Sequence, residues 1–166
     1  WITDGRPADT YPTILRAGRA PLLAVVDMFE ARGARLEHLE VDGAGLAENC
    51  VKSAGYAIRI RDCVIRRGAK RGVWVTGGAD LTHDSYVQGT LINCLIDQGG
   101  RGIGVDCSWD PAIKRSASRG GNFTDGMIYR CRIRNAGEAG AVIGGGWQFL
   151  HNRVSCENMP AGLIVG

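Results

Sequence analysis

Four segments of this chain share one short pattern, and this repeat restricts the fold more than any other feature of the sequence. Each segment has a large apolar residue, a Cys or Asn three positions later, and a β-branched residue two positions after that. The middle positions are Cys63, Cys94, Cys131 and Asn152, and Leu39 fills that place in a weaker, earlier copy. Successive copies are 24, 31, 37 and 21 residues apart. Such spacing is typical of a constant coil that carries loops of variable length.

A second pattern follows each segment a few residues downstream, where a glycine precedes alternating apolar residues. Its copies are 72–75, 102–105, 140–143 and 162–165. Alternation with a period of two predicts short strands separated by glycine turns. One such coil cannot bury its own apolar face, whereas coils stacked about 4.8 Å apart bury a continuous column. We therefore expect an all-β solenoid of about five to six coils.

The alternation also predicts which side chains point inward, namely those at the first, fourth and sixth places of each segment. The four middle residues would then form one internal ladder at a tight bend, where a thiol or an amide can bond to the backbone. We expect the ladder cysteines to be buried and reduced. Interior glycines and β-branched alternation disfavour a helical repeat, and only residues 21–35 could hold one short helix.

The combined pattern, apolar-x-x-Asn/Cys-x-apolar followed by Gly-apolar-x-apolar, resembles that of the right-handed parallel β-helix superfamily of pectate lyases and phage tailspikes. The run at 36–43, Leu-Glu-His-Leu-Glu-Val-Asp-Gly, is similar to the run that often opens the regular coils in that superfamily. The resemblance implies one β-helix domain over residues 1–166, truncated at both ends. Residues 1–21 would be an irregular leading segment and residues 22–166 the coils.

Composition excludes several classes of protein. No apolar run approaches the roughly 18 residues that a membrane-spanning helix needs. A net charge of +3 is too small to indicate a nucleic-acid partner. None of the six cysteines forms a C-x-x-C pair, which disfavours a zinc ribbon. Twenty-five glycines among 166 residues, about twice the average usage, fit a chain with many tight turns.

The resemblance also implies where a site would lie, because the Gly-apolar-x-apolar strands of that superfamily commonly contribute to a carbohydrate groove. Their outward positions here would be Trp74, Gly104, Val142 and Ile164, with Asp106 just past a strand end. The two longest excursions, 76–89 and 106–126, leave from the same corner of successive coils. Long loops on a rigid scaffold are where function concentrates, so we expect these two to wall the groove.

The two excursions and the adjoining strand carry side chains suited to a sugar polymer. Aromatic rings can stack on pyranoses, and cationic side chains can bind uronate or sulfate groups. The candidate substrate-binding residues are Trp74, Trp109, Tyr86, Lys114, Arg115 and Arg119. A glycosidase needs a pair of carboxylates, and a histidine can act as acid or base near neutral pH. The candidate catalytic residues are Asp106, Asp110, Asp84 and His83. The competing interpretation is that these loop charges only keep the loops solvated.

We therefore expect a protein that binds a polysaccharide and degrades it, as a lyase or as a glycoside hydrolase. The alternative is a non-catalytic structural solenoid of a phage tail or fibre, or an adhesin stalk. No cofactor or resident metal is expected, although a lyase would use Ca²⁺ against a substrate uronate. Neither nucleic acid nor a membrane is an expected partner. A homotrimer and an extracellular or virion-associated location would fit either interpretation.

Overall fold

The computed structural model describes residues 9–75, 87–108, 124–144, 146–155 and 160–165, apart from the side chains at 29, 30, 87 and 124. Within these residues every regular element is a β-strand, and the strands form three parallel sheets. Sheet A contains β1 (Ile14–Arg16), β4 (Glu40–Asp42), β7 (Val64–Arg66), β10 (Leu95–Asp97), β13 (Arg132–Arg134) and β16 (Arg153–Ser155). Sheet B contains β2 (Leu22–Arg32), β5 (Ala47–Tyr56), β8 (Arg71–Val75), β11 (Ile103–Cys107), β14 (Ala139–Ile143) and β17 (Ala161–Val165). Sheet C contains β3 (Arg35–Glu37), β6 (Ile58–Arg61), β9 (Val87–Ile92), β12 (Thr124–Tyr129) and β15 (Gly146–Leu150).

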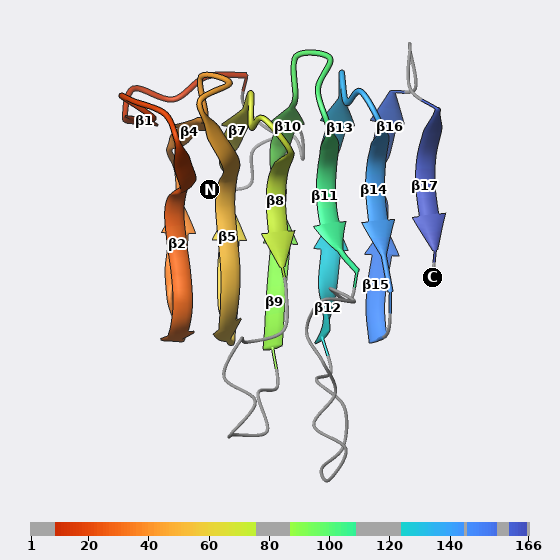
Figure 1. The fold of residues 1–166 in the computed structure, drawn as a ribbon. Helices are drawn as coiled ribbons and strands as arrows, with labels where there is room; N and C mark the ends of the chain where they lie inside the picture. Colours follow the sequence, from red (N-terminus) through yellow and green to blue (C-terminus); the bar gives the residue numbers. More distant parts are fainter. Residues whose placement is uncertain (1–8, 76–86, 109–123, 145, 156–159, 166) are drawn as a thin grey trace, which may run out of the picture.

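The chain passes from sheet A to sheet B to sheet C and then returns to sheet A, one strand further along each time (Figure 1). Each strand therefore pairs in parallel with its equivalents one circuit earlier and one circuit later. This arrangement is compatible with a parallel β-solenoid and confirms the all-β prediction at that level. Strand β1 lies inside the segment predicted to be irregular, and β2 lies where one short helix had been the alternative. No helix long and apolar enough to span a membrane occurs in the described residues.

The predicted inward positions form the core. Ile60, Cys63 and Ile65, at the first, fourth and sixth places of one segment, are all buried. Across sheet B, Val51, Val73 and equivalent residues on β11 and β14 pair in register and are completely buried. Stacking thus joins one apolar side chain from each coil into a continuous column.

The ladder at the turn from sheet C to sheet A is also confirmed. The Sγ atoms of Cys63, Cys94 and Cys131 lie 3.3–3.7 Å from carbonyl oxygens of the preceding coil. Asn152 continues the ladder, because its Nδ2 donates to the Ile128 carbonyl and its Oδ1 accepts from the Cys131 N–H, both at 2.8 Å. The described cysteines are free and buried. Burial, together with the neighbouring thiol of Cys131, raises the pKa of Cys94 well above its ordinary value.

The residue before each ladder position has a positive φ. This conformation lets the chain turn from sheet C to sheet A within two residues. These residues are His38, Asp62, Asn93, Arg130 and His151, with φ between 50° and 57°. Asp and Asn tolerate this left-handed conformation better than most side chains. The two histidines, His38 and His151, therefore belong to turns.

Candidate functional site

The predicted site residues that the structure describes, Trp74 and Asp106, lie side by side on the outer face of sheet B. They are paired in register on β8 and β11, and the row continues to Val142 and Ile164. Gly104 is not part of this row, which corrects the predicted outward set. The chain repeats Gly-apolar-x-apolar from Gly104, two residues later than predicted, so Asp106 lies within the strand. A two-residue shift keeps the same face outward, and alternation alone cannot detect it.

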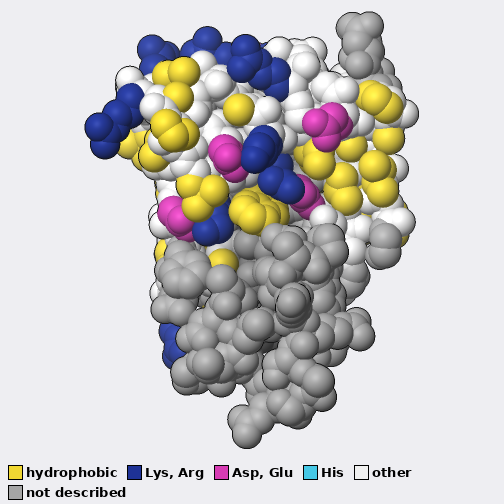
Figure 2. Space-filling model, viewed as in Figure 1, with side chains coloured by type: hydrophobic (Ala, Val, Ile, Leu, Met, Phe, Trp, Pro, Cys, Tyr) yellow, Lys and Arg dark blue, Asp and Glu magenta, His cyan; other side chains and the backbone are white. Residues whose placement is uncertain are grey.

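Trp74 is half-buried and lies among cationic groups. The Arg71 guanidinium carbon is 4.6 Å from the centre of the indole, and the Lys52 Nζ is 5.9 Å from it. Such cation–π contacts stabilise an outward tryptophan on a strand. Figure 2 shows basic and acidic side chains interspersed over β5, β8 and β11, and a hydrophobic patch over β14 and β17. The ring is thus part of a charged cluster on the sheet.

Asp106 is almost completely buried, and both of its carboxylate oxygens accept hydrogen bonds. Oδ2 accepts from the Arg71 Nε at 2.6 Å. Oδ1 accepts from the Ser108 N–H at 3.0 Å and from the Ser108 Oγ at 2.5 Å. Arg71 therefore contacts both predicted residues, since it pairs with Asp106 and stacks over Trp74.

The other candidates lie in 76–86 and 109–123, outside the described residues. They are Asp84, Asp110, His83, Trp109, Tyr86, Lys114, Arg115 and Arg119. The prediction that two long segments leave from the same corner holds for their attachment points, because each follows a sheet B strand and precedes a sheet C strand. Residues 87–89 and 124–126, predicted to be loop, belong instead to β9 and β12.

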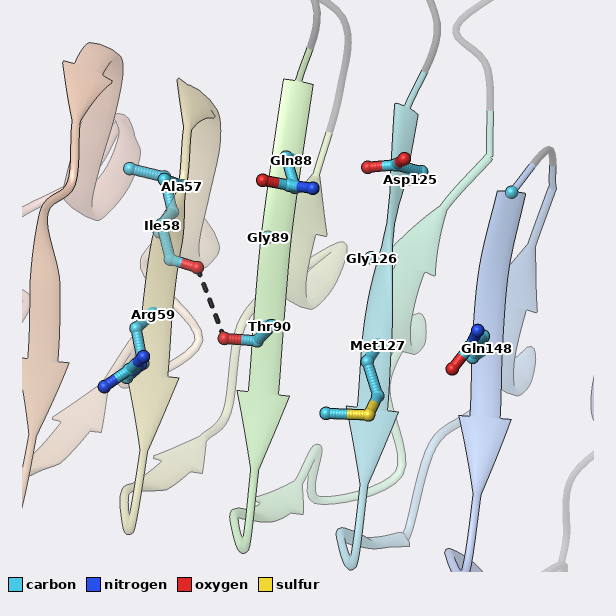
Figure 3. A pocket seen from close by; sticks show the side chains of 11 residues that line it. Ala57, Ile58, Arg59, Gln88, Gly89, Thr90, Asp125, Gly126, Met127 and Gln148 are labelled. Atoms are coloured by element: carbon cyan, nitrogen blue, oxygen red, sulfur yellow. Dashed lines mark hydrogen bonds between the residues drawn. The ribbon is translucent and has the colours of Figure 1, made fainter.

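A groove of about 400 Å³ lies on the outer face of sheet C, across β6, β9, β12 and β15. We call it the sheet C groove. Its first row contains Arg59, Thr90, Met127 and Gln148, paired in register on the four neighbouring strands (Figure 3). The groove expected from the sequence lies over sheet B, whereas this groove lies on the adjacent sheet.

A second row of the sheet C groove lies nearer to the two long segments. Gln88 and Asp125 pair in register, and Gly146 extends the row on β15. Gln88 and Asp125 each come two residues after the end of one of these segments. The sheet C groove thus borders the points where both segments rejoin the sheets.

Beneath this groove, small residues let the sheet pack on an aromatic ring. Trp147 is buried, and a Cβ placed at Gly126 would lie 2.9 Å from its ring and 1.9 Å from the Gly89 carbonyl oxygen. The floor between the two rows is therefore backbone supported by an indole. The side chains around this floor carry amide, hydroxyl, carboxylate and guanidinium groups and one thioether. Such a surface can exchange several hydrogen bonds with a hydroxyl-rich ligand.

The four basic residues around the turn from β7 to β8 do not form an open basic patch. Arg66 pairs with Glu40, Arg67 with Asp42, Lys70 with Glu48, and Arg71 with Asp106. Among the described residues no group of three or more His, Cys, Asp or Glu side chains could hold a metal ion. Sequence reasoning missed the sheet C groove, although its Arg, Thr, Met and Gln occupy equivalent outward positions of successive copies.

Comparisons of the chain with protein-family models, with curated proteins and with solved structures find no match. The class of protein is therefore defined by the fold, by the outer face of sheet B and by the sheet C groove. The chain is an all-β protein of stacked parallel strands with a polar groove on one sheet.

Proposed function

We propose that this chain is a stretch of right-handed parallel β-helix, similar to the pectate-lyase and tailspike superfamily, which binds a polysaccharide and degrades it. The sheet C groove is the observation that carries this proposal. It runs across four strands, and each of these strands contributes at least one polar side chain to its lining. Neighbouring strands are about 4.8 Å apart, which is close to the length of one pyranose unit. An extended sugar chain along the groove would meet a new side chain at each unit.

The degrading activity is proposed for the corner that joins sheet B to sheet C. The segments 76–86 and 109–123 attach there, and they contain His83, Asp84 and Asp110. Asp106 is proposed to join them as the base or nucleophile, because both of its oxygens accept hydrogen bonds and neither is placed as a proton donor. A lyase of this kind would use Ca²⁺, bound jointly with the substrate uronate.

A structural solenoid is the second candidate, and the hydrophobic patch of sheet B favours it. Val142 and Ile164 point outward from β14 and β17, and Ile164 is 44% exposed. Exposed apolar patches often mark interfaces between chains. A fibre or stalk would bury this patch, for example in a homotrimer, and would need no catalytic residues.

Binding to a polysaccharide panel tests the proposal. Affinity would be measured by titration calorimetry for the unaltered protein and for a Thr90→Ala/Gln148→Ala variant. We expect the variant to bind about tenfold more weakly, since it loses two hydrogen-bonding side chains of the sheet C groove. The control, Thr13→Ala, alters an exposed threonine away from the groove and should leave affinity unchanged.

Product analysis on the same panel separates the kinds of activity. Unsaturated products, followed by their ultraviolet absorbance, would indicate a lyase, and reducing ends alone a hydrolase. Binding without products would remove the degrading activity from the proposal. Absence of binding across the panel, with a trimeric mass by light scattering, would favour the structural solenoid.

A further inference from the structure

We propose that Arg35 and Arg59 form an anion subsite at one end of the sheet C groove, which receives a carboxylate or sulfate group of an acidic polysaccharide. This inference rests on the proposed function, because it specifies the charge of the polymer that the groove binds. It assigns a role to two residues that no sequence pattern had indicated.

The first observation is the position of the two arginines. Arg35 on β3 and Arg59 on β6 are register partners in neighbouring parallel strands, and both are exposed on the outer face of sheet C. Their Cα atoms are therefore about 4.8 Å apart. Arg59 lines the groove and continues the row through Thr90, and in Figure 3 its guanidinium points away from Thr90. Arg35 thus extends the groove by one strand.

The second observation is that neither arginine has an ion-pair partner among the described residues. Glu37, the acid nearest in sequence to Arg35, is the register partner of Arg61. Arg61 also donates to Asp62 at 2.8 Å. Three arginines in or next to sheet A differ in this respect. Arg16 and Arg134 donate to aspartates at 2.8 Å, and Arg67 at 2.9 Å.

Two like charges opposite each other on adjacent strands repel, so this arrangement destabilises the sheet unless an anion lies between them. Two guanidinium groups one strand apart can each donate a pair of hydrogen bonds to the same carboxylate or sulfate. The neighbouring Thr90 and Gln148 would then bind the hydroxyl groups of the following sugars. The polymer would run across the strands with an acidic unit over β3 and β6.

Matched polymers test the subsite. Dextran, carboxymethyl dextran and dextran sulfate share one backbone and differ in charge, and alginate would be compared with its carboxyl-reduced form. At low salt we expect each acidic polymer to bind about tenfold more tightly than its neutral counterpart. An Arg35→Ala/Arg59→Ala variant should lose this difference between the acidic and the neutral polymers. Both side chains are exposed, and circular dichroism would verify that the variant is folded.

The control variant, Arg19→Ala/Arg153→Ala, removes two exposed arginines that do not line the groove and should keep the full difference. Equal binding of acidic and neutral polymers, or a preference that survives in the Arg35/Arg59 variant, would overturn the subsite and leave the proposed function standing. Failure of every polymer to bind would overturn both. Single-stranded DNA that binds as tightly as alginate, with the same dependence on the two arginines, would make the surface a general polyanion site and overturn the assignment to polysaccharide.

Discussion

Three glycines near the start of strands in sheet B occur where no larger side chain would fit. A Cβ at Gly104 would lie 2.4 Å from the Gly140 carbonyl oxygen and 2.5 Å from a methyl carbon of Ile133. Gly72 and Gly140 meet equivalent obstacles one coil earlier and one coil later. Their φ angles are not positive, so the conformation would permit other residues. Glycine occurs there because each strand of sheet B passes directly over a side chain of sheet A.

Gly104→Ala should therefore lower the free energy of unfolding by about 1–3 kcal/mol, because neither the backbone oxygen nor the buried isoleucine can move aside freely. Urea unfolding followed by circular dichroism measures this. Gly18→Ala is the control, since nothing lies within 4 Å of that position, and its effect should be small. Equal effects of the two substitutions would contradict the close packing of sheets A and B.

The buried thiols should be unreactive in the folded protein. Burial raises the pKa of Cys50 to about 12, and that of Cys94 well above its ordinary value. Since the thiolate is the nucleophile, iodoacetamide at pH 8 should label both residues only after unfolding. Mass spectrometry of the peptides gives the labelling rate of each cysteine. Rapid labelling of Cys94 in the native protein would place it outside the core.

At the scale of single elements, charged pairs link neighbouring strands on the outer faces of the sheets. Burial alone would raise the pKa of Asp42, but hydrogen bonds from Arg67, the Ala44 N–H and Arg16 outweigh it and hold the pKa below its ordinary value. Asp97 follows the same pattern, with Asn135 and Arg134 as donors that outweigh burial. These pairs join strands of sheet A that are adjacent in space and belong to successive coils.

The protein should consequently lose stability in acid. A carboxyl group whose pKa is lower in the folded state stabilises it above the unfolded pKa, near 3.8, and that contribution disappears as the pH falls through the folded value. The free energy of unfolding should therefore fall as the pH is lowered from about 5 to 2. Urea titrations over this range measure the slope. Asp42→Asn should be less stable at pH 7 and show a shallower slope, and an unchanged slope would contradict the assignment.

Arg71 should matter more to stability than its neighbour Lys70. Arg71→Ala leaves the nearly buried Asp106 without its cation, and we expect a loss of about 2 kcal/mol. Lys70→Ala breaks an exposed pair with Glu48 and should cost less than about 1 kcal/mol. Thermal unfolding of the two variants makes the comparison. Equal losses would indicate that the Asp106 pair contributes no more than a surface pair.

Over the whole molecule, the repeat predicted the features that depend on every coil alike. The ladder of Cys63, Cys94, Cys131 and Asn152, and the inward rows around it, follow from spacing and alternation alone. The register at Asp106 does not follow from the repeat. Gly102 and Gly104 are two residues apart, and a shift of the strand by two residues keeps the same side chains outward. The sheet C groove was not predicted either, although its first row occupies equivalent outward positions of successive copies. Its side chains point outward, where alternation allows any polar residue, and only the stacking of four strands brings them together.

A crystal structure of the protein with a bound acidic oligosaccharide tests the central claim most directly. The expected result is three parallel sheets with the oligosaccharide on the outer face of sheet C, its acidic group between Arg35 and Arg59 and its following units over Thr90, Met127 and Gln148. An oligosaccharide bound elsewhere, or strands that do not place the four ladder residues above one another, would contradict the account.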